Sequence, residues 1–290
     1  MKTVFVIGAG GFVGQHLVRH LAANGMCVLA ISRPGKASSD YPGIEWIASD
    51  LASGDTSRWP ARYDALIYLA QSAKWRDFPA GAEDVVRVNV DSVLRAAEHA
   101  RVAGAKRFLH MSTGSVYAQN LEPTREDENI PIGVNRSFYV ASKLAAELML
   151  GPYAAYFGLT HLRLFMPYGP GENEQMLIPR LLLKIRAGDT IDLHGNDGLL
   201  SNPIYVVDVA EATRRCLALE GSQTLNLGGP HVLTLRQVAE TIGSAIGKTP
   251  VFQTKPESAP VIVGDISRLK TVLGWQPPTR FVDGVKLWLG

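Results

Sequence analysis

The first 25 residues restrict the possible folds more than any other stretch of the chain. The β-branched run "TVFVI" leads directly into the glycine-rich "GAGGFVG", and apolar residues then recur every four positions through "VGQHLVRHLAANG". This pattern predicts a buried strand, a tight turn and an amphipathic helix. Such a unit at the start of a chain favours an α/β fold.

Similar units follow. Short apolar runs occur at "CVLAIS", "IEWIAS", "ALIYLA", "RFLHMS" and "THLRLF", and helical patterns such as "EDVVRVNVDSVLRAAEHARVAG" lie between several of them. Alternating strands and helices imply parallel strands with right-handed crossovers and helices on both faces of the sheet. We therefore predict a Rossmann-type, doubly wound parallel sheet.

The composition changes after about Pro167. The turn-rich "YGPGENEQ" begins this part, and later helices such as "LRQVAETIGSAIG" are separated by connections that contain proline and glycine. We expect a main domain over residues 1–166 and a smaller C-terminal lobe mainly over residues 167–290. A strand near "QTLNLGG" is expected to return to the main sheet.

The charge balance argues against a polyanionic partner. The chain has 29 Lys and Arg against 27 Asp and Glu, a net charge of +2, and no basic run is interleaved with aromatic residues. We therefore expect no binding to nucleic acid or to a membrane surface. No apolar run approaches the roughly 20 residues that span a bilayer. The expected partner is a small molecule.

The cysteines and histidines give no metal or disulfide pattern. Cys27 and Cys216 each lie in an apolar stretch, which indicates reduced packing residues and, without a signal peptide, a cytoplasmic location. His16 and His20 lie four apart on the predicted first helix and could bind a metal, but no third ligand is near them in the sequence. We expect a solvated helix face and no metal.

The glycine-rich turn predicts a dinucleotide site. Missing side chains let backbone N–H groups and a helix N-terminus approach a pyrophosphate, and the strand, turn and helix around the turn give it the required context. The alternative is a plain tight turn. If the prediction holds, residues 1–166 are a dinucleotide-binding domain. The expected contacts are Gly8, Gly10, Gly11, Phe12, Val13 and Gly14.

The end of the second predicted strand bears on the choice of cofactor. An Asp or Glu there would accept hydrogen bonds from the adenosine ribose of NAD. This chain has "ISRPG" instead. The hydroxyl of Ser32 and the guanidinium of Arg33 suit a 2′-phosphate, which favours NADP(H) and leaves NAD(H) as the alternative.

Tyr139 and Lys143 lie four residues apart in a predicted helix and therefore share a face. A phenol with a pKa near 10 is a weak base at neutral pH, and lowering that pKa by about three units requires roughly 4 kcal/mol. We expect Lys143 and an oxidised nicotinamide to contribute this stabilisation. Thr113 or Ser112, at the end of the fifth strand, would hold a substrate oxygen at the carboxyl edge of the sheet.

Further motifs extend nearly from end to end. They are "SDL" at Ser49 to Leu51, "IYLAQ" at Ile67 to Gln71, Asn89, "YVASK", "LRLFMPYGPG", "NPIYVVDVAEA" and "LGWQP". With the glycine turn and Thr113, they make the chain resemble the extended short-chain dehydrogenase/reductase family. That family includes sugar-nucleotide epimerases, dehydratases and 4-ketoreductases.

The resemblance implies hydride transfer between a nicotinamide and a substrate carbon. In this reading Tyr139 is the acid/base, Lys143 binds the nicotinamide ribose and Thr113 positions the reacting oxygen. It also implies a homodimer that packs through two helices per subunit. The further cofactor contacts that it implies are Asp50, Leu51, Leu69, Ala70, Gln71 and Asn89.

The chain departs from the family pattern at several positions. Gly114 and Ser115 replace the Asp-Glu pair of the dehydratases, so dehydration is not expected, because glycine cannot act as a carboxyl acid. Met166 replaces an asparagine, Met176 a polar residue and Ser201 an arginine that binds diphosphate. The expected diphosphate site therefore has fewer positive side chains than is usual in the family, although Lys255 takes the place of a second family arginine.

A nucleoside-diphosphate sugar is the first choice of substrate, and a smaller or less charged carbonyl compound is the alternative. Arg180, Lys184 and Arg186 add positive charge on the helix after the turn-rich loop. Asp208 is expected to cap a helix. The candidate substrate contacts are Ser72, Thr113, Met166, Met176, Arg180, Ser201 and Lys255.

Three functions fit the sequence. The first is NADP(H)-dependent reduction of a 4-keto sugar nucleotide, which Ser32 and Arg33 favour. The second is NAD-dependent 4-epimerisation, which the same catalytic residues would serve. The third is a non-catalytic NADP-binding regulator, against which the presence of Thr113, Tyr139 and Lys143 speaks.

Overall fold

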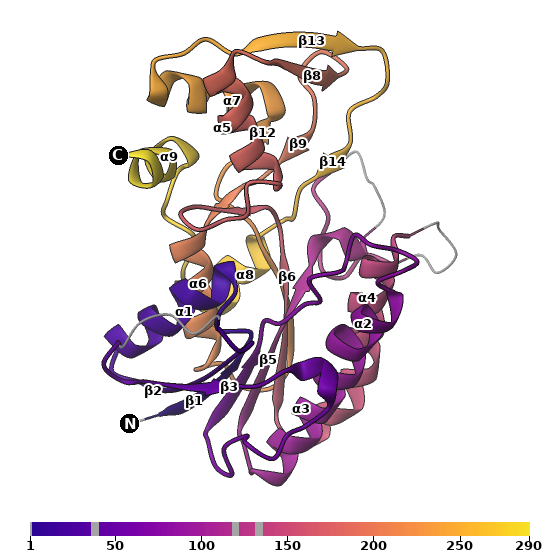
Figure 1. Ribbon diagram of the computed structural model, residues 1–290, viewed down its shortest axis with the longest axis vertical. Coiled ribbons are helices and arrows are strands. Elements are labelled where there is room, and N and C mark those ends of the chain that lie inside the picture. Colours follow the sequence, from indigo (N-terminus) through magenta and orange to yellow (C-terminus); the bar gives the residue numbers. More distant parts are fainter. Residues whose placement is uncertain (1, 36–40, 118–121, 131–135) are drawn as a thin grey trace. The chain divides into compact units, whose positions relative to one another are not determined.

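The computed structural model describes residues 2–35, 41–117, 122–130 and 136–290 (Figure 1). The chain divides into two compact units. Unit 1 comprises Met1–Val116, Pro131–Arg163 and Ala210–Leu225, and unit 2 comprises Tyr117–Ile130, Leu164–Val209 and Asn226–Gly290.

A seven-stranded sheet organises unit 1, with the strand order β11-β6-β5-β4-β1-β2-β3. The pairings of β1 with β2 and β4, of β2 with β3 and of β4 with β5 are parallel. The predicted Rossmann-type fold class is thereby confirmed. The strands are β1 (Thr3–Ile7), β2 (Cys27–Ser32), β3 (Ile44–Ala48), β4 (Ala65–Tyr68), β5 (Arg107–Thr113), β6 (Gly158–Leu164) and β11 (Gln223–Leu227).

The strand order reverses between β1 and β4, because the chain builds β1 to β3 in one direction and β4 to β6 in the other. In open α/β sheets ligands bind at such a reversal, beyond the carboxyl ends of the strands. Every residue of β4 and of β5 is buried. Strand β4 is a continuous apolar run because helices cover both faces of a parallel sheet. Strand β5 also buries the polar residues Arg107, His110, Ser112 and Thr113.

Helices lie on both faces of this sheet in Figure 1, with α2, α3 and α4 along one face and α1 and α6 along the other. A π-helical turn, η2, interrupts the run from α2 to α3. The buried core under α3 and α4 includes Phe5, Tyr68, Phe108 and Leu150. The helical segments are α1 (Phe12–Ala23), α2 (Ala82–Val86), η2 (Arg87–Asp91), α3 (Ser92–Val102), α4 (Phe138–Leu150) and α6 (Val206–Cys216).

Unit 2 is built from helices and short sheets. A capping box between Thr234 and Gln237 starts α7, and Gly188, with φ of 77°, ends α5. Helices α5, α7 and α9 share an apolar core that includes Leu181, Ile242 and Val285. The helices are α5 (Leu177–Ala187), α7 (Leu235–Ile246), α8 (Ser267–Leu273) and α9 (Phe281–Leu289).

The described strands of unit 2 form three small sheets. Strand β8 (Thr190–His194) pairs with β13 (Val251–Lys255), and β7 (Pro167–Tyr168) pairs with β10 (Ile204–Tyr205), both in parallel. The third sheet has the order β12-β9-β14. Its strands are β9 (Leu200–Ser201), β12 (Leu233–Thr234) and β14 (Val261–Ile262). No helix in the described part of the chain has the length and apolar character needed to cross a bilayer.

Candidate active site

The glycine turn joins β1 to α1 in unit 1. Gly8 has φ of 91°, and a Cβ atom there would lie 2.6 Å from the backbone nitrogen of Ala70, which follows β4. A Cβ atom at Gly14 would collide with the carbonyl oxygen of Gly8. Both glycines are therefore required for the close approach of turn, helix and neighbouring strand.

The N-terminus of α1 has no side-chain cap: Gly11 holds the N-cap position without a side chain that could bond the first turn. Uncapped N–H groups and the positive end of a helix dipole suit an anion. Because the turn also excludes side chains from this surface, its geometry fits the diphosphate of a dinucleotide.

Ser32 and Arg33, at the end of β2, differ in their exposure to solvent. Ser32 is buried, and its hydroxyl donates to the carbonyl oxygen of Arg33 at 3.3 Å. Arg33 is exposed.

Asp50, after β3, accepts a hydrogen bond from the backbone N–H of Ala52 at 3.0 Å and caps the short 3-10 turn η1 (Leu51–Ser53). This cap fixes the position of Asp50 and Leu51.

Three candidate catalytic residues meet at the carboxyl end of β5. Ser137 caps α4, so that Tyr139 and Lys143 occupy successive turns on one face of the helix. The Thr113 hydroxyl lies beside the Tyr139 phenol and lowers its pKa by hydrogen bonding. Ser112, by contrast, has a buried hydroxyl oxygen without a partner among the described residues. Of the two hydroxyls considered in the sequence, Thr113 is the one that contacts the phenol.

Burial dominates the electrostatics of this group. It raises the pKa of Tyr139 to about 12, and the hydrogen bond from Thr113 offsets only part of that rise. Burial also lowers the pKa of Lys143 to about 8, while the charge of Glu147 acts in the opposite direction. The Lys143 ammonium donates to the carbonyl oxygen of Met111 at 3.0 Å.

The protein groups alone raise the pKa of the phenol, whereas the expected lowering of that pKa requires the oxidised nicotinamide as well as Lys143. The reason is that removing the phenolate from water costs more than the surrounding protein groups return. The protein alone therefore holds a protonated phenol beside Thr113.

Asn89 connects the loop after β4 to α4. It lies in the π-helical turn η2 and is fully buried. Its amide donates to the Ser142 hydroxyl at 2.9 Å, and its side-chain oxygen accepts from the backbone N–H of Ser72 at 2.9 Å. π-helical turns frequently occur at functional sites, because the extra residue redirects a side chain.

The loop after β4 contains several predicted contacts. The Leu69 backbone N–H donates to Ile7 at 2.8 Å, which continues the sheet to the glycine turn. Gln71 is exposed. Ser72 is buried, and its hydroxyl donates to Asp84 and accepts from the backbone N–H of Lys74. The structure thus gives the Ser72 hydroxyl partners within the fold.

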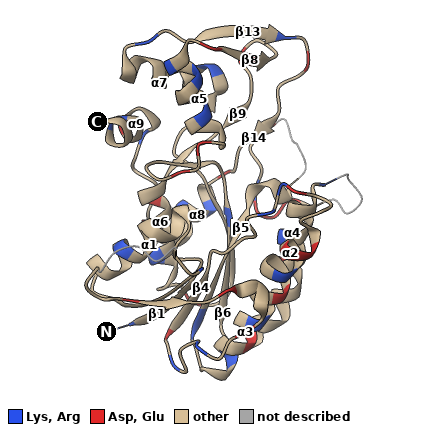
Figure 2. Ribbon diagram, in the orientation of Figure 1, with Lys and Arg blue, Asp and Glu red and all other residues tan. Residues whose placement is uncertain are grey.

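The other candidate substrate contacts lie in unit 2. Met166 has φ of 39°, Met176 is the N-cap of α5, and Arg180 is exposed on that helix. Ser201 is buried in β9. Lys255, at the end of β13, lies 3.5 Å from Asp192. The basic residues of α5 are visible as blue segments in Figure 2.

Two features of the site were not predicted from the sequence. Trp75 packs against Tyr139 with ring centroids 5.0 Å apart. Arg163 of β6 forms a buried ion pair with Glu147, with the shortest N···O distance 2.7 Å. The one available signal for the pair was Glu147, four residues beyond Lys143 on the same helix face, because an unpaired carboxylate is rarely buried.

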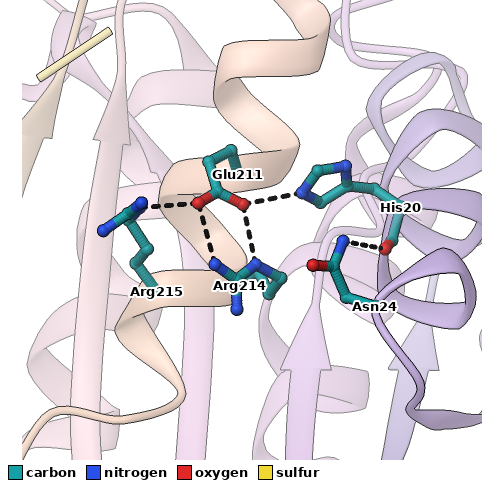
Figure 3. A network of polar contacts seen from close by, with 5 residues as sticks. All are labelled: His20, Asn24, Glu211, Arg214 and Arg215. Carbon is teal, nitrogen blue, oxygen red and sulfur yellow. Dashed lines mark hydrogen bonds and ion pairs between the residues drawn. The ribbon is translucent and has the colours of Figure 1, made fainter. Parts of the chain in front are cut away.

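The second histidine of α1 has a carboxylate partner. The Nε2 atom of His20 lies 2.7 Å from Glu211, which also binds Arg214 and Arg215 (Figure 3). Asp208 is buried, and its carboxylate accepts from the backbone N–H and the hydroxyl of Thr279, both at 3.0 Å. Within the described residues, no three His, Cys, Asp or Glu side chains are grouped so as to hold a metal ion.

Comparison with known proteins decides the family. Residues 4–228 match the model of the "NAD dependent epimerase/dehydratase family". The chain belongs to this family. It is therefore an enzyme, and the resemblance to extended short-chain dehydrogenases/reductases is confirmed.

Relatives match the chain over almost its full length. It is 28% identical to a UDP-glucose 4-epimerase from Mycolicibacterium smegmatis, over 98% of this chain and 96% of the relative. The solved structure of MoeE5 with UDP-glucuronic acid and NAD is 26% identical, with a TM-score of 0.82 over 98% of this chain and 96% of that one. A Thermus thermophilus UDP-glucose 4-epimerase with NAD is also 26% identical, with a TM-score of 0.80 over 99% and 97%.

Proposed function

We propose that this enzyme is a nucleotide-sugar 4-epimerase that uses a nicotinamide dinucleotide. The observation that carries the proposal is the grouping of Thr113 and Tyr139 at the carboxyl end of β5, with Lys143 one helical turn from Tyr139. The relatives support the choice of reaction, because those described above are UDP-sugar 4-epimerases or bind UDP-sugars and NAD. The sequence alone ranked reduction first, whereas the epimerases among these relatives support epimerisation.

The residues of unit 1 fit the cofactor. The glycine turn and the uncapped start of α1 suit the diphosphate. Asp50 and Leu51, which the 3-10 turn holds, would contact the adenosine. Leu69, Ala70 and Gln71 would line the nicotinamide half, with Asn89 holding their loop. When bound, an oxidised nicotinamide supplies a hydride acceptor and a positive charge.

Tyr139 would move the proton. We infer that the Tyr139 phenolate takes the proton of the sugar hydroxyl as that carbon is oxidised, and that the resulting phenol returns the proton after the ketone has turned its other face. Thr113 would hold the reacting oxygen during both steps. A phenol with a pKa of about 12 acts as a base at neutral pH only if the phenolate gains roughly 7 kcal/mol. Lys143, bound to the nicotinamide ribose, would contribute part of it.

The substrate end of the site would come from the second part of the chain. We keep the proposal that residues 1–166 bind the dinucleotide and that residues 167–290 mainly bind the nucleoside diphosphate sugar. Arg180 on α5 and Lys255 on β13 are the cations proposed for the diphosphate. Lysine neutralises phosphate as a point charge and lacks the bidentate geometry of arginine.

One observation favours a second candidate function, the NADP(H)-dependent reduction of a 4-keto sugar. The exposed guanidinium of Arg33 follows β2 where a carboxylate would select NAD, and Ser32 is beside it. A reductase needs an exchangeable cofactor that the cell keeps reduced, whereas an epimerase recycles a bound one. The choice between NADP(H) and NAD(H) is therefore linked to the choice of reaction.

A single assay separates these functions. The purified protein is incubated with UDP-glucose or UDP-glucuronic acid, and the sugar isomers are separated by chromatography. We expect interconversion of C4 isomers without net change in absorbance at 340 nm. Stoichiometric NADPH oxidation by a 4-keto sugar nucleotide, with no isomer formed, would establish the reductase instead. Tyr139→Phe is expected to abolish turnover while retaining dinucleotide binding, and unaltered turnover would remove Tyr139 from the mechanism.

We also propose a homodimer that forms through α3 and α4. Apolar side chains on this part of unit 1 are exposed: 71% for Val102 and 67% for Leu148, with Met149 and Tyr156 nearby in sequence and also exposed. Exposed apolar surface of this kind marks interaction sites. Sedimentation equilibrium at micromolar concentration tests the proposal, and a monomer would contradict it. Leu148→Glu is expected to shift the wild-type dimer toward monomer.

A further inference from the structure

An aromatic side chain from the loop after β4 covers the proposed catalytic phenol. The ring of Trp75 packs against the ring of Tyr139, with centroids 5.0 Å apart and planes at 51°. The guanidinium carbon of Arg76 lies 4.3 Å from the centroid of the same indole. Trp75 is half-buried, although its sequence neighbours Lys74 and Arg76 are exposed.

The loop holds this indole in place from several sides. The Ser72 hydroxyl bonds Asp84 and the backbone N–H of Lys74, so the segment before Trp75 is anchored to α2. The backbone N–H of Asp77 donates to the carbonyl oxygen of Lys74 at 2.9 Å, which closes a turn around Trp75. The position of the indole is therefore set by the fold of the loop.

Beyond this turn, a second aromatic pair joins the same loop to α4. The rings of Phe78 and Phe138 stack with centroids 5.1 Å apart, and Phe138 precedes Tyr139 in the helix. The two aromatic pairs thus connect one loop to two successive residues of α4. Phe78 itself is 62% exposed and forms no ring pair with Tyr139, so the two contacts can be separated by mutation.

We propose that Trp75 is a positioning residue for the proton transfer, which fixes the orientation of the Tyr139 ring and keeps water from it. The inference rests on the proposed role of Tyr139. A tilted aromatic pair of this geometry is worth about 0.5–1.5 kcal/mol beyond its burial, enough to restrict a ring that turns on one bond. Thr113 of β5 bonds the phenol, Arg76 faces the indole, and Lys143 lies one turn further along α4.

The packing of Trp75 against Tyr139 has two chemical effects. It holds the phenol oxygen toward Thr113, where the reacting oxygen of a substrate would lie, and misplacement by about 1 Å can cost 100-fold in rate. It also desolvates the phenol, in agreement with the raised pKa of Tyr139. A negative charge on the phenolate then depends on the positive groups that face it rather than on water.

The first test measures ionisation and needs no turnover. The ultraviolet difference spectrum between the protein and its Tyr139→Phe variant isolates this one phenol, and it is recorded against pH with Trp75 intact or replaced by Ala or Phe. We expect the Tyr139 step to lie above pH 11 with Trp75 or with Trp75→Phe. With Trp75→Ala it is expected to move down by a pH unit or more. An unchanged step in Trp75→Ala would overturn the proposal, whatever the reaction proves to be.

The second test uses the complete enzyme with its cofactor. Trp75→Ala is expected to lower kcat about 10- to 100-fold with KM changed less than threefold, and Trp75→Phe to restore most of kcat. Phe78→Ala, which removes the other aromatic contact of the loop, is the matched control and is expected to retain wild-type kcat. Equal losses in Trp75→Ala and Phe78→Ala would show general loosening of the loop and would contradict the proposal. A failed 4-epimerase assay would contradict the proposed function, whereas the ionisation test of Trp75 does not depend on that assay.

Discussion

Unit 1 contains two groups of ionisable side chains that respond differently to their surroundings. Around Glu211, on α6, three positive or protonatable partners converge on one carboxylate: His20 and Arg214 at 2.7 Å and Arg215 at 2.6 Å (Figure 3). Along α4, Lys143 is buried and Tyr139 is half-buried, and each has few partners. The first group is fully paired and partly solvated, whereas the second is largely buried and has few partners.

The pKa values record this difference. The bonds from Arg214, His20 and Arg215 lower the pKa of Glu211 to about 2, so pairing favours its charged form. Burial raises the pKa of Tyr139 to about 12 and lowers that of Lys143 to about 8, so both neutral forms are favoured. The ion pairs of Glu211 therefore contribute to the stability of the fold. Tyr139 and Lys143 are less stabilised in their charged forms by the protein, which leaves them able to gain from interactions with a ligand.

Both kinds of group, paired and underpaired, occur on α4, where Glu147 is the paired one. It follows Lys143 by one turn, yet its carboxylate is engaged by the Nε and Nη2 atoms of Arg163 at 2.7 to 3.2 Å. Both side chains of this ion pair are under 10% exposed (8% and 6%). The same helix face therefore runs from an underpaired end at Tyr139 to a fully paired end at Glu147.

The largest expected effect comes from breaking that buried pair. Arg163→Met leaves the Glu147 carboxylate buried and unpaired, which should cost about 3–5 kcal/mol of unfolding free energy. Urea denaturation followed by circular dichroism measures it. The double variant Arg163→Met and Glu147→Met is expected to recover most of the loss, since apolar replacement of a buried pair is often neutral. A single variant as stable as the double variant would refute the pairing argument.

A smaller effect is expected at Lys143, and in activity rather than stability. Lys143→Met removes the proposed ribose contact and the positive charge near Tyr139, so kcat should fall about 100-fold, or about 2.7 kcal/mol. Unfolding free energy should stay equal or rise, because a buried ammonium has been replaced by an apolar chain of similar length. Steady-state kinetics and urea denaturation of the same preparation test both parts. A clear loss of stability would place Lys143 with the structural group.

The smallest effect is expected at Glu211. Glu211→Gln should lose about 1–2 kcal/mol of stability, because partial solvent exposure screens its ion pairs, and should keep wild-type turnover. The sign of the pH dependence follows from the lowered pKa. The Glu211 contribution is complete above its unfolded pKa near 4.5 and is lost as pH falls toward about 2.

Denaturation midpoints of wild type and Glu211→Gln, measured from pH 6 down to pH 3, check this prediction. The gap between the two curves should narrow toward the acid end. A constant gap over the whole range would mean that Glu211 acts through packing rather than through its charge.

The sequence predicted those parts of the molecule that depend on local pattern. The apolar runs located six strands of the main sheet, and the glycine turn, whose crowded Gly8 and Gly14 the structure explains, was found by its context. The i, i+4 spacing placed Tyr139 and Lys143 on one helix face because helix geometry is fixed by the backbone. Membership of the family followed from the same motifs.

Sequence reasoning failed where long-range packing decides. The rise in the pKa of Tyr139 depends on burial by distant segments, of which Trp75 is one, and no spacing rule reveals it. Likewise, Arg163 reads as a residue of an ordinary strand until β6 is placed beside α4 and its side chain is found on Glu147. Such contacts join residues that have no fixed separation along the chain.

The backbone of Met166 has a consequence for attempts to redesign the enzyme. Its φ of 39° lies in the left-handed region, where asparagine and glycine are tolerated and β-branched residues are severely disfavoured. In this respect the family's asparagine suits the conformation better than the methionine present here. A library that varies position 166 to alter substrate choice will therefore select for foldability at the same time, and Val, Ile and Thr should be depleted from it before any catalytic screen begins.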